Sequence, residues 1–255
     1  MTGTVARRRG SFGFAIVTLA MVVTCLGLGI WQLQRRLEKH TLIAALNERL
    51  AMAPEALPAL AQWSALTPAK DEFRRVSFTA TYAKLPDGMV YSSGSAVRDD
   101  ISGPGTWAFL PAQTDAAIVA VNTGFAQNTM QDRAQQDRAV SRLVTGQSVK
   151  LTGYLRFPEV AGTLTPAENT AMHLWFSRDH LAMARALGWG EGGKAVAPFY
   201  VDLESPAPES GIPKPGPLTV RLKDDHLQYA ITWFGLAGAV MIAFAVWWRG
   251  QRRTA

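Results

Sequence analysis

Cysteine is almost absent from this sequence. Cys25 is the only cysteine among 255 residues, which excludes an internal disulfide framework and a cluster of thiolate metal ligands. The common catalytic motifs are missing as well. No GxxxxGK(S/T) loop, HExxH, CxxC or GxSxG motif occurs, and no GxGxxG sequence joins a predicted strand to a predicted helix. The sequence therefore predicts no catalytic residues, which argues against an enzyme without excluding one whose site carries no common motif.

The excess of positive charge is confined to the two ends of the chain. There are 26 Lys and Arg residues against 20 Asp and Glu, a formal net charge of +6. Three arginines occupy positions 7–9 and three more are Arg249, Arg252 and Arg253, so positions 10–248 carry 20 basic and 20 acidic side chains. Nucleic-acid binding needs basic residues gathered on a folded surface, which argues against that function. A hydrophobic content of 48% excludes a disordered chain.

Two long runs lack charged residues altogether. Phe12–Leu33 and Leu227–Trp248 each contain 22 such residues, and about 20 helical residues cross a bilayer core. We therefore expect two transmembrane helices. A secretory signal has an apolar core of only about 7–15 residues and a small-residue cleavage site, which the first run lacks. The alternative is a cleaved signal that ends near Gly27 or Gly29.

The charges beside the two runs predict the orientation. Short Arg-rich segments next to a span stay in the cytoplasm, so we expect both termini there, although Arg35, Arg36 and Lys39 beyond the first run weaken this signal. The predicted organisation is a cytoplasmic basic tail over 1–11, a transmembrane helix over 12–33, an extracytoplasmic domain over 34–226, a second transmembrane helix over 227–248 and a second basic tail over 249–255.

Small residues recur at intervals of four in both runs. The second run carries Gly235, Ala239 and Ala243, and the first carries Cys25 and Gly29. Small residues on one face allow two helices to approach closely, so one interpretation is that the two spans pack on each other or on helices of a partner. The other interpretation is that alanine and glycine are simply common in spans.

The region between the runs is rich in predicted strands. A helix over 36–52 continues the first run and ends before Pro54. Alternating or apolar stretches then predict strands over 73–82, 89–92, 106–112, 117–125, 148–157, 171–176 and 198–203. The segment 127–144 is polar, and we expect its Gln, Arg and Asp residues to be solvated. A short helix over 178–187 should have Ser177 as its N-cap and Gly188 at its end.

The proline-rich segment 205–217 reads as an extended linker back to the membrane. Many short strands with few helices favour an antiparallel sheet or a small barrel with helices at its edge. The predicted fold class is therefore an α+β membrane protein in which two transmembrane helices flank one β-rich domain.

Among the four histidines, His226 has the most suggestive position. His40 is expected at the surface, and the seven-residue separation of His173 and His180 matches no common metal site. His226 directly precedes the second run, where Asp224 or Asp225 can cap the helix. A neutral imidazole there could ligate haem iron, with Tyr229 and Trp233 on the same side of the helix. The alternative is an aromatic belt at the membrane surface, and spacing alone favours the belt.

Two motifs at the membrane boundaries resemble a known family. The stretches LGIWQLQRRLEK (28–39) and DHLQYAITWFGLA (225–237) resemble the Surfeit locus 1 family. Between them, GPGTWAFLPAQ and AIVAVNTGFA resemble the family's central strands, and LTGYLRFPE and WFSRD resemble its later segment. The positions that match its terminal motifs are Gly29, Trp31, Gln32, Arg35, Lys39, Leu227, Tyr229 and Trp233. The chain departs from the usual pattern at Glu38, Thr123, Phe125, Asp224 and Asp225.

The resemblance implies a role in the assembly of haem–copper oxidases, mainly cytochrome c oxidase. It implies the oxidase catalytic subunit and the haem a synthesis enzymes as partners, and haem a as cofactor. The residues expected to bind haem are His226, as iron ligand, with Tyr229 and Trp233 beside it. A tail of about 11 residues before the first span is short for a transit peptide. We therefore expect the bacterial cytoplasmic membrane, with the central domain in the periplasm.

Two other functions remain open at this point. The chain could be a membrane-anchored scaffold that holds the nascent oxidase and never binds haem. It could also, with less support, be a periplasmic enzyme whose site carries no recognisable motif.

Overall fold

The computed structural model describes residues 3–95, 97–127, 133–219 and 224–253. The chain divides into two compact units. One combines the two ends of the chain, Met1–Ala44 with Leu222–Ala255, and we refer to it as the helix pair. The other is Ala45–Arg221, the barrel domain.

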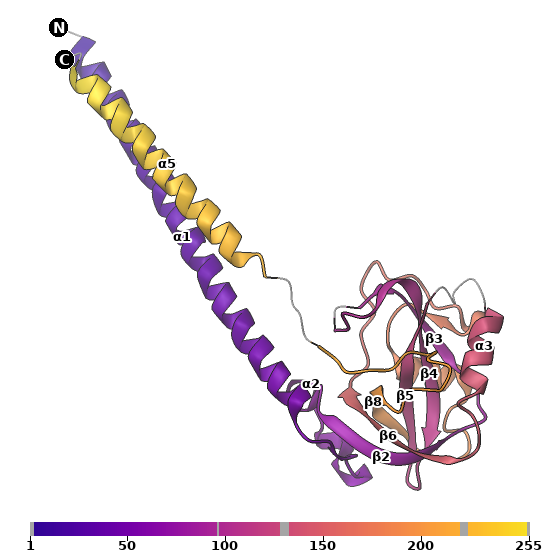
Figure 1. Ribbon diagram of the computed structural model, residues 1–255. Helices are drawn as coiled ribbons and strands as arrows, with labels where there is room; N and C mark the ends of the chain where they lie inside the picture. Colours follow the sequence, from indigo (N-terminus) through magenta and orange to yellow (C-terminus); the bar gives the residue numbers. More distant parts are fainter. Residues whose placement is uncertain (1–2, 96, 128–132, 220–223, 254–255) are drawn as a thin grey trace. The chain divides into compact units, whose positions relative to one another are not determined.

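Two long helices build the helix pair. Helix α1 spans Gly3–Ala51 and helix α5 spans His226–Arg253, and both are long and apolar enough to cross a membrane. The predicted helix over 36–52 is confirmed as an unbroken continuation of the first apolar run, since α1 ends at Ala51, ahead of Pro54. The helices run antiparallel, and the beginning of α1 lies at the same end of the pair as the end of α5 (Figure 1).

One face of α1 packs on α5. Its buried members are Thr18, Val22, Cys25 and Gly29. A Cβ atom on Gly29 would lie 2.5 Å from the ring of Phe234, so the absence of a side chain there allows the close approach. The prediction that Cys25 and Gly29 lie on a helix-packing face is confirmed.

The small residues that α5 buries are not the ones predicted from the spacing of four. The residues that α5 buries are Ala230 and Ala237. A Cβ atom on Gly235 would meet nothing within 4 Å, and Ala239 and Ala243 are exposed. The idea that these three pack the second helix on the first is therefore wrong, because the aromatic ring of Phe234 selects a neighbouring face of α5 by filling the gap above Gly29.

Eight strands form the sheet of the barrel domain. They are β1 (Glu55–Ala56), β2 (Arg75–Tyr82), β3 (Gly88–Gly94), β4 (Ser102–Gln113), β5 (Ile118–Gln127), β6 (Ser148–Arg156), β7 (Leu174–Trp175) and β8 (Val196–Ser205). Their order is β1-β2-β6-β8-β5-β4-β3-β7, and a further pairing of β2 with β4 closes five of them into a barrel. The small barrel is confirmed. It is not wholly antiparallel, because β5 and β8, β1 and β2, and β3 and β7 pair in parallel.

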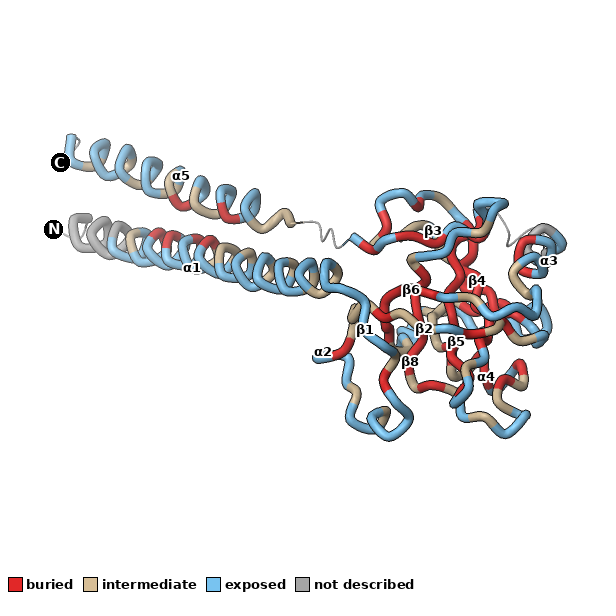
Figure 2. Tube along the Cα trace, turned by 60° about the horizontal axis from the view of Figure 1, so that its bottom comes forward, coloured by how far each residue is buried: buried red, intermediate tan, exposed pale blue. Residues whose placement is uncertain are grey.

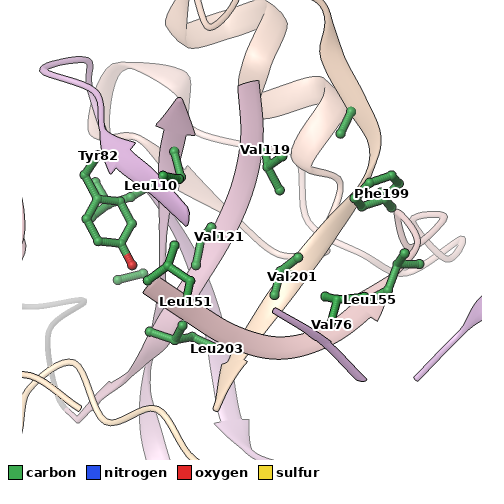
Figure 3. Close-up of a cluster of buried hydrophobic side chains, with 14 of the residues drawn as sticks. Val76, Tyr82, Leu110, Val119, Val121, Leu151, Leu155, Phe199, Val201 and Leu203 are labelled. Atoms are coloured by element: carbon green, nitrogen blue, oxygen red, sulfur yellow. The ribbon is translucent and has the colours of Figure 1, made fainter. Parts of the chain in front are cut away.

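The apolar core fills the barrel. Its largest fully buried members include Leu110 of β4, Leu151 and Leu155 of β6 and Phe199 of β8, which Figure 3 shows together. Strand β5 is buried on both faces, since Val119 and Val121 belong to this core while Phe125 belongs to a second cluster outside it. Burial of both faces explains why the sequence of β5 reads as a nearly continuous apolar run.

Short helices decorate the barrel. They are η1 (Leu60–Ala65), α2 (Pro68–Asp71), α3 (Arg133–Ser141), η2 (Thr170–Met172) and α4 (His180–Leu187). Helix α3 leaves Asp137 and Arg138 exposed, as expected for the polar residues of 127–144, and buries the apolar Ala139 and Val140. Positions 128–132 lie outside the described residues. In the 171–176 segment only β7 is strand, since the Asn169 side chain accepts a hydrogen bond from the Met172 amide and starts η2.

Helix α4 begins later than predicted. Its N-cap is Asp179 and not Ser177, because the Asp179 carboxylate accepts hydrogen bonds from the amides of Leu181 and Ala182. The predicted end is confirmed, with Gly188 in the left-handed region at φ 72°.

The proline-rich segment is more than a linker. The backbones of Phe125 and Lys214 exchange two hydrogen bonds of 3.1 and 2.8 Å, and Leu218 is buried. A Cβ atom on Gly124, which has φ +129°, would lie 2.3 Å from the Lys214 carbonyl carbon. Glycine is therefore needed for the segment to lie against β5.

Candidate functional site at the start of helix α5

The packing face of α1 continues outward as a polar stripe. Beyond Cys25 and Gly29, the side chains of Gln32, Arg36 and His40 each reach a residue at the start of α5. The last three are four residues apart, which places them on one face of the helix. We call these three residues the polar stripe.

His226 is the first residue of α5 and is held in two places. Its ring Nδ1 lies 2.7 Å from Oε1 of Gln32. Its backbone N–H donates to Oδ1 of Asp224 at 3.0 Å, so Asp224 supplies the helix-capping oxygen that the sequence predicted of Asp224 or Asp225. The other ring nitrogen, Nε2, makes no hydrogen bond to another described residue.

Asp224 joins the cap to the polar stripe. Its Oδ2 lies 2.7 Å from Nε2 of His40 and 3.4 Å from Nε of Arg36. Partial burial raises the pKa of Asp224, but hydrogen bonds from His40 and from the His226 backbone lower it more, so the net pKa is below the ordinary value. The carboxylate is therefore charged at neutral pH and faces two basic side chains.

The two aromatic residues predicted to lie beside His226 differ in how far they are buried. Trp233 is half-buried, whereas Tyr229 is exposed. Of the other family-motif positions, Gly29 and Gln32 contact α5. Trp31, Arg35 and Leu227 are exposed, Arg35 pairing with Glu38 at 2.8 Å, and Lys39 is half-buried. Exposed Trp31 and Tyr229 also suit an aromatic belt, so both interpretations of these rings stay predictions.

The described residues suit haem better than a bare metal ion. They include no group of three or more His, Cys, Asp or Glu side chains placed to hold a metal. The porphyrin of haem supplies four nitrogen ligands to the iron, so the protein needs to supply only one or two more. An imidazole held through Nδ1, whose Nε2 bonds to no other residue in the described part of the chain, fits that requirement. Arg221 and Lys223 precede His226 in the sequence and carry positive charge that would suit haem propionates, but they lie outside the described residues.

The remaining histidines occupy other settings. His40 is exposed, as expected, but its bond to Asp224 was not predicted. His173 lies in the left-handed region at φ 52°, at the end of η2. His180 is completely buried, and its Nε2 donates to the Ala197 carbonyl at 3.0 Å. Burial lowers the pKa of His180 to about 4, although this hydrogen bond acts in the opposite direction.

A buried polar network in the barrel domain escaped the sequence analysis. Arg156 lies 2.7 Å from Asp202 and 2.6 Å from Glu72, and Asn122 donates to Asp202 at 2.7 Å. The Phe73 ring covers Arg156 at 4.5 Å, with Phe73 at φ 65°. The signal was a single charge inside an apolar stretch of strand, as in LTGYLRF and FYVDL. The network satisfies charges that the barrel buries.

Fold and site together define a class of protein: a small closed β-barrel domain flanked by two apolar helices, with a capped histidine at the start of the second. Residues 19–238 match the model of the SURF1 family. The match covers most of the chain, and the chain belongs to this family.

Relatives from distant eukaryotes support the assignment. A SURF1-like protein of Drosophila melanogaster is 31% identical over 248 residues, covering 91% of this chain and 75% of the relative. Surfeit locus protein 1 of Homo sapiens is 30% identical over 239 residues, covering 88% and 73%. A SURF1-like protein of Monosiga brevicollis is 26% identical over 251 residues, covering 95% and 88%.

Proposed function

We propose that this chain is a membrane-anchored assembly factor for a haem–copper oxidase of the cytochrome c oxidase type. Family membership supports the oxidase role. The single observation that carries the site is the imidazole of His226, held through Nδ1 by Gln32 and through its backbone by Asp224. In this proposal the protein performs no catalysis and acts on the oxidase catalytic subunit, in company with the enzymes that synthesise haem a.

The anchoring part of the proposal concerns topology. Both helices cross the bilayer of a bacterial cytoplasmic membrane, both termini are cytoplasmic, and residues 34–226 lie in the periplasm. Its support is the length and apolarity of α1 and α5 and their antiparallel arrangement (Figure 2 shows how much of each helix is exposed). The exposed apolar side chains of the two helices would contact lipid.

Reporter fusions test this topology. An alkaline phosphatase placed after Ala255 should be inactive, because this enzyme folds only outside the cytoplasm. A fluorescent protein at the same position should be bright, because it folds in the cytoplasm. The same phosphatase inserted at Gly162, in a loop of the barrel domain, should be active. An active phosphatase after Ala255 would contradict the two-span arrangement.

In the haem part of the proposal, His226 would hold the iron of a bound haem. Haem a is the cargo, and when bound it supplies the redox-active iron that the oxidase needs. The chain's own residues orient the ligand: Gln32 holds the ring and Asp224 holds the backbone at the start of α5. Tyr229 and Trp233 offer aromatic surface on the same helix, three and seven residues from the ligand.

Spectra of the purified protein test the haem part. The chain is coexpressed with haem a synthesis enzymes, and its haem content is compared with those of His226→Ala and His173→Ala. The wild type and His173→Ala should carry equal haem, and His226→Ala should lose most of it. Haem-free wild type would leave the scaffold function. Unchanged haem bands in His226→Ala would show that another residue is the ligand.

A further inference from the structure

The contact between Gln32 and His226 joins residues 194 positions apart in the chain. We infer that Gln32 is the positioning residue of the site: its carbonyl oxygen accepts the Nδ1–H of His226 and so makes Nε2 the ring nitrogen with the free lone pair. The consequence for haem rests on the proposed function. The consequence for the imidazole does not.

The chemistry of the imidazole carries the inference. A neutral imidazole has one nitrogen that donates and one that accepts. Because Oε1 of Gln32 is an acceptor at 2.7 Å, Nδ1 must carry the proton. Metal-binding histidines are commonly held in this way, with the second nitrogen donating to an oxygen that fixes the tautomer and the direction of the ring.

Both partners of this bond are held by other contacts. Gln32 lies about one turn beyond Gly29, where α1 packs against the Phe234 ring. The backbone of His226 is bound by Asp224, which is held in turn by His40 and Arg36. The polar stripe therefore fixes the first turn of α5 at both the ring and the backbone of His226.

Nuclear magnetic resonance of the full chain in detergent reads the tautomer without haem. Histidine is labelled with ¹⁵N, the His226 signals are assigned by their loss in His226→Ala, and spectra are taken near pH 8.5, about two units above the ordinary histidine pKa. The wild type should show a protonated Nδ1. Gln32→Met keeps the length of the side chain but removes the acceptor, so the Nε2–H tautomer should appear.

Two variants separate the hydrogen bond from general damage. Gln32→Glu keeps an oxygen in place and should retain the Nδ1–H tautomer. Gln34→Met makes the same change two residues along, at an exposed position on the opposite side of α1, and should leave His226 unchanged. Signals of the barrel-domain histidines, His173 and His180, report in every variant whether that domain remains folded.

Ferric haem b, titrated into the detergent-solubilised chain and followed by absorbance, gives the second readout. Gln32→Met should weaken binding by about 10- to 100-fold, the usual effect of removing a residue that orients a metal ligand. Gln32→Glu and Gln34→Met should bind like the wild type. A wild-type His226 protonated on Nε2, or a Gln32→Met variant with an unchanged tautomer, would overturn the inference. The expected tautomers without any haem binding would support the inference and contradict the haem part of the proposed function.

Discussion

The helix pair and the barrel domain differ in how far they bury their apolar side chains. In the barrel domain Leu155 is 0% exposed, whereas Leu19 of α1 is 64% exposed and Val246 of α5 is 65% exposed. The barrel domain thus provides its own apolar interior. The helix pair leaves most of its apolar surface uncovered, which is costly in water and favourable in lipid. The difference is what the proposed anchoring of the helix pair in a bilayer predicts, and the barrel domain needs no such surroundings for its core.

The largest expected effect comes from emptying the barrel core. Leu155→Ala should lower the free energy of unfolding by about 2–5 kcal/mol, because it removes buried methyl groups and leaves a cavity. Leu164→Ala, at a loop position that is 96% exposed, should change it by less than about 0.5 kcal/mol. Leu19→Ala should behave like Leu164→Ala. Urea unfolding of the full chain in mild detergent, followed by near-ultraviolet circular dichroism, measures all three; equal effects would remove the contrast between the units.

A pH titration sharpens the comparison, since the barrel domain buries a neutral histidine. The pKa of His180 is about 4 in the folded chain and about 6.5 when unfolded. Between these values only the unfolded chain binds the proton, so stability falls as the pH falls from about 6.5 to about 4. The loss should total about 3 kcal/mol. His180→Gln, whose amide can still donate to Ala197, should lack this part of the pH dependence; parallel profiles for the two proteins would contradict the assignment.

Within the helix pair, the sharpest steric test is at Gly29. Gly29→Leu places a side chain where the Phe234 ring lies and should weaken the packing of α1 on α5 by about 1–3 kcal/mol. Gly27→Leu is the matched control, because a Cβ atom there meets nothing within 4 Å. Buried Cys25 provides the readout. In detergent it should react faster with N-ethylmaleimide in Gly29→Leu alone, and equal rates in both variants would argue against this packing face.

The smallest expected effect concerns the cap of α5. Asp224→Ala removes the oxygen that binds the His226 amide and should cost about 1 kcal/mol of helix stability. Asp224→Asn keeps a capping oxygen, and ion pairs with partners as exposed as Arg36 and His40 contribute little, so it should cost less than Asp224→Ala. Hydrogen exchange of the first-turn amides of α5 measures both. A loss of helix stability in Asp224→Asn as large as that in Asp224→Ala would mean that the charge of Asp224, and not its capping oxygen, stabilises the start of α5.

Local patterns in the sequence predicted much of the fold. Alternation and turn residues located most strands of the barrel, and charge-free runs located both apolar helices. The closure of the barrel through Thr81 with Gln113 and Tyr82 with Ala112 could not be predicted, since it depends on long-range pairing. The packing face of α5 could not be predicted either. Gly235 and Ala237 are both small, and only the Phe234 ring against Gly29 decides which face is buried.

The candidate site was predictable in part. The position of His226 before an apolar run drew attention to it, and its role as ligand stays a prediction. Its partner Gln32 is 194 residues away, and His40 is 184 residues from Asp224. No periodicity connects such residues; only the antiparallel packing of α1 and α5 does. The spacing of four residues between Gln32, Arg36 and His40 can be read from the sequence, but the sequence does not show which residues the polar stripe contacts.

The most direct test of the proposed function is oxidase assembly in a strain that lacks this gene. Membranes of the deletion strain should show reduced cytochrome c oxidase activity and a weaker haem a absorption band, relative to membranes with the wild-type gene restored. Complementation with His226→Ala should leave both low at normal protein levels, and complementation with His173→Ala should restore both. Normal oxidase activity and a normal haem a band in the deletion strain would contradict the account.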